Sequence, residues 1–116
     1  MPKKWVINAS PLILLGKIDR LSLLTVLTDA LVIPLGVATE LREGKDTDVA
    51  RRWIETTGAV FIRTLNFVPD VIGGWDLGRG ECEVLAWAYA HHEFEAVLDD
   101  RAARNARQLG DGGVDV

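Results

Sequence analysis

Four short apolar segments, each followed by a segment of helical period, constrain the fold of this 116-residue chain more than any other feature. They are KWVIN, ALVIP, AVFIR and EAVLD, which we predict as strands at residues 4–8, 30–34, 59–63 and 95–99. Strands that alternate with helices form a mainly parallel sheet covered on both faces. The sequence therefore predicts a three-layer α/β/α fold in the order β-α-α-β-α-α-β-α-β-α.

The helical segments are predicted from caps and from apolar spacing. The first is expected to have Ser10 in the capping position and Pro11 at the first helical position. The following helices are expected to bury these apolar side chains: Leu21, Leu23, Leu24 and Leu27; Val37 and Leu41; Val49, Trp53 and Ile54; and, in a helix over residues 81–92, Val84, Leu85, Ala88 and Tyr89. A last helix is expected over residues 101–109.

Length and cysteine content bound the class of protein. A chain of this length predicts one domain over residues 1–116. Its single cysteine, Cys82, excludes an internal disulfide and fits a reducing compartment. Polar residues interrupt the apolar start of the chain, and no window reaches the roughly 18 apolar residues of a membrane helix, so we expect a cytoplasmic protein without a signal peptide.

A formal net charge of −4 argues against binding nucleic acid through a broad positive field. No DNA contact of its own is therefore expected. The charge does not exclude a nuclease, because carboxylates that bind a metal ion look acidic when the ion is not counted.

Polar residues occur where these elements begin or end. Asn8 ends the first predicted strand, Glu40 lies in the helix after the second, Glu81 lies in the first turn of a helix, and Asp99 and Asp100 end the fourth strand. In parallel α/β sheets, ligands bind outside the carboxyl ends of the strands. Carboxylates packed together repel each other unless a cation joins them, and oxygen ligands suit Mg²⁺ or Mn²⁺. We therefore predict a metal pocket formed by these five residues, suited to phosphodiester hydrolysis.

Each residue also has an ordinary structural interpretation. The alternatives are a solvated helix residue for Glu40, a partner of the helix dipole for Glu81, a helix cap for Asp99 or Asp100, and a turn residue for Asn8. Glu83 is a weaker site candidate than Glu81. Cys82 and Ser10 have no evident histidine and acid partners, which argues against a covalent mechanism.

Four segments together resemble a known family. VINASPLILLGKI, VIPLGVATEL, GRGECEVLAWA and VLDDRAAR resemble the PIN-domain ribonucleases over residues 5–110, and most closely the small prokaryotic branch that includes VapC-like toxins. The resemblance implies that Asn8 replaces the first-strand aspartate. It implies that Glu40, Glu81 and Asp100 or Asp99 are the further acidic residues, and that Ser10 helps to shape the site.

The same resemblance implies a Mg²⁺- or Mn²⁺-dependent endoribonuclease that cleaves single-stranded RNA. In this interpretation Glu40, Glu81 and Asp100 are catalytic, and the protein is a homodimer inhibited by a small antitoxin. Arg101 and Arg104 share one side of their predicted helix and are expected to guide RNA phosphates, with a solvated face as the alternative.

Two departures from the family pattern motivate a second hypothesis. Asn8 carries no negative charge, and the Gly-rich segment LGDGGVDV stands where PIN domains continue, so we expect the C-terminal strand and helix to be missing. The second hypothesis is a catalytically degenerate PIN domain that binds a partner. A receiver-like phosphoacceptor domain is the third, but it requires its acidic pair after the first strand.

Overall fold

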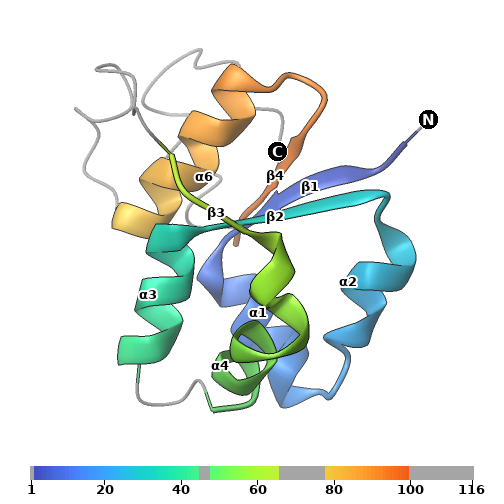
Figure 1. Ribbon diagram of the computed structural model, residues 1–116, viewed down its shortest axis with the longest axis vertical. Helices are drawn as coiled ribbons and strands as arrows, with labels where there is room; N and C mark the ends of the chain where they lie inside the picture. Colours follow the sequence, from blue (N-terminus) through green and yellow to red (C-terminus); the bar gives the residue numbers. More distant parts are fainter. Residues whose placement is uncertain (1, 45–47, 66–77, 100–116) are drawn as a thin grey trace.

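A computed structural model describes residues 2–44, 48–65 and 78–99 and places a parallel four-stranded sheet in them (Figure 1). The strands are β1 (Lys4–Ile7), β2 (Ala30–Pro34), β3 (Ile62–Arg63) and β4 (Glu95–Val97). Their order across the sheet is β3-β2-β1-β4, and all three pairings are parallel. The predicted α/β fold with a mainly parallel sheet is confirmed. From β1 the chain first adds β2 and β3 on one side of β1 and then returns to place β4 on the other side. The order of the sheet therefore reverses between β1 and β4.

Helices cover both faces of this sheet. They are α1 (Ala9–Lys17), α2 (Ser22–Leu27), α3 (Leu35–Glu43), α4 (Asp48–Glu55) and α6 (Arg79–Ala90), with a short 3₁₀ helix, η1 (Thr57–Phe61). Figure 1 shows α6 on one side of the sheet and α1 and α4 on the other. No helix in the three described ranges is both long enough and apolar enough to cross a membrane.

The core is formed where the inner strands meet these helices. It includes the fully buried side chains of Val6, Ile7, Leu12, Ile33, Val37, Leu41, Ile54 and Val84. Gly16 lets α1 and α4 approach closely, since an added Cβ would lie 3.3 Å from the backbone nitrogen of Ala50. Ala50 is consequently buried, while the predicted core residue Val49 is exposed.

Other predicted core positions are also wrong. Leu23, Leu27 and Tyr89 are exposed. Helix α2 has six residues and packs mainly through Leu24, so its apolar stripe is wider than the surface it can bury. Periodicity identifies the side of a helix that faces the core but does not fix how wide the contact is.

The start of α1 differs from the prediction. The helix begins at Ala9 with Asn8 in the capping position, so Ser10 is not the cap but an exposed residue of the first turn. Pro11 is the third helical residue. Proline is tolerated there because the first four N–H groups of a helix have no acceptor within it.

The third strand is shorter than predicted. Residues 59–61 belong to η1, and β3 retains only the two residues that pair with Ile33 and Pro34. The chain leaves α4 so tightly that a Cβ on Gly58 would lie 2.6 Å from the Trp53 ring. The predicted helix at 101–109, which contains Arg101 and Arg104, lies outside the described residues, as does Asp100.

Candidate functional site

Asn8 and Asp99 follow neighbouring strands at the point where the order of the sheet reverses. Ile7 is paired in register with Val97, and the Asn8 backbone N–H donates a hydrogen bond to the Val97 carbonyl oxygen at 3.0 Å. Both residues therefore lie at the carboxyl edge of the sheet, with Asn8 buried and Asp99 half-buried. Reversal points of this kind are where open α/β sheets bind their ligands.

The Asn8 side chain has an acceptor without a partner. The residue is only 3% exposed, and its Oδ1 atom is buried without a hydrogen-bond donor in the described part of the chain. Its side chain also makes no capping bond to α1, which argues against the interpretation as a local turn residue. An unsatisfied buried acceptor costs roughly 1–3 kcal/mol, so a cation or a donor at this place is favoured.

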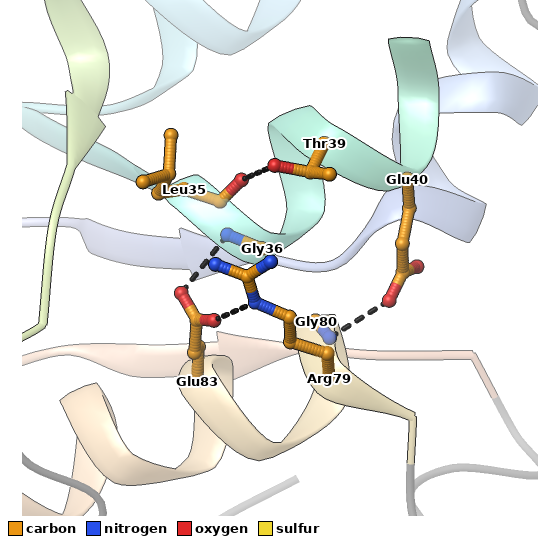
Figure 2. A network of polar contacts seen from close by, with 7 residues as sticks. All are labelled: Leu35, Gly36, Thr39, Glu40, Arg79, Gly80 and Glu83. Carbon is orange, nitrogen blue, oxygen red and sulfur yellow. Dashed lines mark hydrogen bonds and ion pairs between the residues drawn. The ribbon is translucent and has the colours of Figure 1, made fainter. Parts of the chain in front are cut away.

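Glu40 reaches from α3 to the beginning of α6. Its Oε1 atom accepts a hydrogen bond from the Gly80 backbone N–H at 2.7 Å, and the residue is exposed (Figure 2). A Cβ on Gly80 would lie 2.8 Å from that oxygen, so glycine permits the contact. Glu81 is the next residue along α6 and is half-buried in its first turn. The structure thus brings Glu40 to the turn that carries Glu81.

Glu83 makes the reciprocal contact from α6 to α3. It is 9% exposed, and its Oε1 atom accepts a hydrogen bond from the Gly36 backbone N–H at 2.9 Å. Its Oε2 atom accepts a bond from Arg79 Nε at 3.0 Å. Figure 2 shows both contacts beside the Glu40–Gly80 bond. The bonds Gly36–Glu83 and Glu40–Gly80 also show that the first halves of α3 and α6 run antiparallel.

These two carboxylates cap the two helices. Gly36 and Gly80 are the second residues of α3 and α6, and N–H groups at that position have no acceptor within their own helix. The capping positions are occupied by Pro34 and Gly78, which make no side-chain capping bond. Each helix is therefore capped by a glutamate of the other, an arrangement that we call the reciprocal cap.

Cys82 is a poor nucleophile in this environment. Burial raises the pKa of its thiol, and the negative charges of Glu81 and Glu83 raise it further. The thiolate is the reactive form, so a raised pKa keeps the residue protonated and inert near neutral pH. This agrees with the expectation that no covalent mechanism uses Cys82.

The structure brings the predicted site residues together in two groups. Asn8 and Asp99 lie at the ends of β1 and β4, and the carboxylate of Glu40, from α3, reaches the first turn of α6, which carries Glu81. Within the described ranges no three Asp, Glu, His or Cys side chains form a metal-binding group, and Asp100 lies outside those ranges. The oxygen donors suit a hard divalent cation in type, and the unpartnered Asn8 Oδ1 fits a ligand there.

Sequence reasoning ranked Glu83 behind Glu81 and did not identify Arg79, Gly36 or Gly80. One signal was available for the arginine, because Arg79 and Glu83 are four residues apart, which is the spacing of an ion pair within one helix; the predicted helix, however, began only at Glu81. For the glycines the signal was weaker. Each stands at the start of a helical segment, where a neighbouring side chain can approach the backbone.

A parallel sheet with oxygen-bearing side chains at its reversal point is the arrangement at which open α/β proteins bind their ligands. Residues 4–110 match the family described as DUF3368: PIN domain, so the chain belongs to the PIN-domain family. Members of this family are typically nucleases and usually bind divalent metal ions. Comparison with curated proteins and with solved structures gives no significant match.

Proposed function

We propose that this protein is a divalent-metal-dependent endoribonuclease that cleaves single-stranded RNA and acts in the cytoplasm. One structural observation carries the proposal within the PIN family. Asn8 Oδ1, a buried amide oxygen without a hydrogen-bond partner among the described residues, lies at the carboxyl end of β1, on the edge where Asp99 follows β4. Such an oxygen favours a cation over an empty apolar cavity.

Asn8, Glu40, Glu81, Asp99 and Asp100 would hold the Mg²⁺ or Mn²⁺ ion. When bound, the ion supplies an activated water and neutralises charge on the phosphate. Glu40 is already oriented, because Gly80 fixes its Oε1 atom while Oε2 points away from Gly80 (Figure 2). Asn8 contributes a neutral oxygen, which lowers the charge of the cage by one relative to aspartate.

Residues around the cage would have separate roles. Glu40, Glu81 and Asp100 are the catalytic residues of the proposal. Ser10 is exposed in the first turn of α1, immediately after the Asn8–Ala9 pair, and would help to shape the site. Arg101 and Arg104 would guide RNA phosphates toward it.

We further propose that the protein is the toxin of a VapC-like toxin–antitoxin pair and forms a homodimer. Exposed apolar side chains on α1 and α2, among them Leu14 and Val26, support a protein partner on that side. Where exposed apolar residues form a contiguous patch, they are typical of interaction surfaces. A small antitoxin protein would bind the toxin, and no DNA contact by this chain is proposed.

The test is cleavage of an unstructured fluorescent RNA in Mn²⁺ and in EDTA. Glu40→Gln and Asp100→Asn are expected to reduce cleavage roughly 100-fold, because lost metal-site groups cost at least that order in activity. Glu43→Gln is the matched control, since it removes the same charge from an exposed position of α3. Equal cleavage by all variants, or full cleavage in EDTA, would remove the assignment.

A degenerate PIN domain that only binds a partner is the second candidate. The neutral Asn8 favours it, as does the lack of a group of three metal-binding side chains within the described ranges. Titration calorimetry with Mn²⁺ separates the two candidates. The degenerate domain predicts no heat of binding, whereas the nuclease predicts binding that Asn8→Asp strengthens.

A further inference from the structure

Among the described residues, Arg79 is held through its Nε atom. Its Nε atom donates to Glu83 Oε2 at 3.0 Å, and the arginine side chain is 61% exposed while that of Glu83 is 11% exposed. The terminal nitrogens Nη1 and Nη2 form no bond with the described residues. An arginine that only neutralises a carboxylate commonly uses two parallel bonds, and this one leaves four N–H groups outward.

Helix stability does not explain an arginine at this position. Arg79 is the first residue of α6, where the helix dipole disfavours a cation. Its pair with Glu83 also has the less stabilising order along a helix, with the basic residue before the acidic one. The stem of the side chain instead packs over α3, where a Cβ on Gly36 would lie 3.1 Å from Arg79 Cγ.

Arg79 lies in the first turn of α6, the turn that also carries Gly80 and Glu81, and its guanidinium is on the side of the helix that carries Glu83. Arg79 immediately precedes Gly80, whose N–H binds Glu40, and stands two residues before Glu81. This region contains the acidic residues Glu40 and Glu81, and the whole chain has a net charge of −4. A polyanion that approaches such a site needs a local positive group.

We propose that Arg79 binds a phosphate of single-stranded RNA through Nη1 and Nη2, and that Glu83 is the positioning residue that holds its guanidinium by Nε. The identity of the ligand rests on the proposed function. The two terminal nitrogens match two oxygens of one phosphate. Because Glu83, itself bonded to the Gly36 N–H, holds the arginine before RNA arrives, less side-chain freedom is lost on binding.

The experiment measures affinity for a labelled, unstructured RNA over a range of salt concentrations. It is performed in Mn²⁺ with cleavage-resistant phosphorothioate RNA, and again in EDTA. Arg79→Gln is expected to weaken binding about tenfold and to reduce the slope of log affinity against log salt by about 0.7, the value for one phosphate of a single strand. Arg79→Lys should retain the slope and recover part of the affinity.

Glu83→Gln tests the positioning role. The amide oxygen of glutamine can still accept a hydrogen bond from the Gly36 N–H. The amide NH₂ group, which takes the place of Oε2, cannot accept one from the Nε–H of Arg79. We expect weaker RNA binding with an unchanged salt slope, because the arginine charge remains. A purely structural role for the pair predicts lower stability with unchanged affinity of the folded protein.

Arg51→Gln is the matched control. Arg51 forms an exposed ion pair with Asp48 at 2.9 Å on α4, away from α6 (Figure 1). Equal affinity and slope for Arg79→Gln and Arg51→Gln would overturn the inference. The inference would also be overturned if the wild-type protein bound no RNA, or if Arg79→Gln weakened binding of an acidic peptide and not binding of RNA. Binding that depends on Arg79 without cleavage in Mn²⁺ would refute only the nuclease proposal.

Discussion

Replacing Gly36 by alanine should destabilise the protein, although alanine ordinarily favours a helix over glycine by about 1 kcal/mol. The added Cβ would lie 2.8 Å from Glu83 Cδ and closer still to Oε2. That carboxylate cannot move freely, because it is buried and bonded to the Gly36 N–H at 2.9 Å. The substitution therefore forces apart the two helices that the reciprocal cap joins.

The magnitude follows from the contacts that must change. A hydrogen bond to a charged group contributes about 1.5–3 kcal/mol, and overpacking a tight contact costs about 1–3 kcal/mol. The exposed Arg79 side of the pair adds little, because solvent screens it. After the helix-propensity gain is subtracted, we expect the free energy of unfolding to fall by about 1.5–5 kcal/mol. For a chain of this size that corresponds to roughly 10 °C in Tm.

Urea unfolding, followed by circular dichroism, measures this change. Gly78→Ala is the control, because its nearest contact, Glu40 Oε1, would be 3.7 Å from the new Cβ. That variant is expected to change the unfolding free energy by less than about 1 kcal/mol, the ordinary cost of alanine in a capping position. If Gly36→Ala unfolds at the same urea concentration as the wild type or a higher one, the Glu83 carboxylate does not occupy the place described.

Two further predictions concern the buried polar groups. Asn8→Asp should lower Tm in EDTA, because it puts a charge in a buried place, and Mn²⁺ should raise the Tm of this variant more than that of the wild type; equal shifts would contradict a cation at this position. Burial and the charges of Glu81 and Glu83 raise the pKa of the Cys82 thiol, so iodoacetamide should alkylate the folded protein more slowly than the urea-unfolded chain near pH 8. Because the folded state favours the neutral Cys82 thiol, its contribution to stability is complete below the ordinary thiol pKa and is lost as pH rises through the raised pKa. Cys82→Ser should therefore reduce the loss of stability at alkaline pH. An identical dependence of stability on alkaline pH in both proteins would contradict this.

Local pattern was sufficient to predict the elements but not their arrangement. The strands at β1, β2 and β4 were found because each is a compact apolar segment bounded by polar residues or proline. Parallel pairing followed from the helices between them. The order β3-β2-β1-β4 could not be derived, because it depends on which faces pack together over long range. The error at residues 59–61 has a similar origin, since the turn that packs Gly58 on Trp53 overrides their β-forming tendency.

The positions of the candidate residues could be predicted at strand ends and less well on helices. Asn8 and Asp99 were placed correctly because a residue that ends a parallel strand must lie at the carboxyl edge of the sheet. Glu81 and Glu83 could not be ranked in this way. They are two residues apart on α6 and so project about 200° apart around the helix. Only the position of α3 determines that Glu83 is the one that binds Gly36.

The reciprocal cap couples the candidate site to the stability of the fold. Glutamates that lie near each other repel, but here Glu40 and Glu83 each receive a backbone N–H from the positive end of a helix. The helix ends therefore offset part of the repulsion between the two carboxylates. It follows that Glu40 can bind a cation through Oε2 without loss of its bond to Gly80, whereas a ligand that used both oxygens would have to uncap α6. A substitution at Gly36 or Gly80 disturbs the reciprocal cap and should therefore change the position of the Glu40 carboxylate. Because the same substitution also lowers stability, its effect on cleavage must be measured on protein that is shown to be folded.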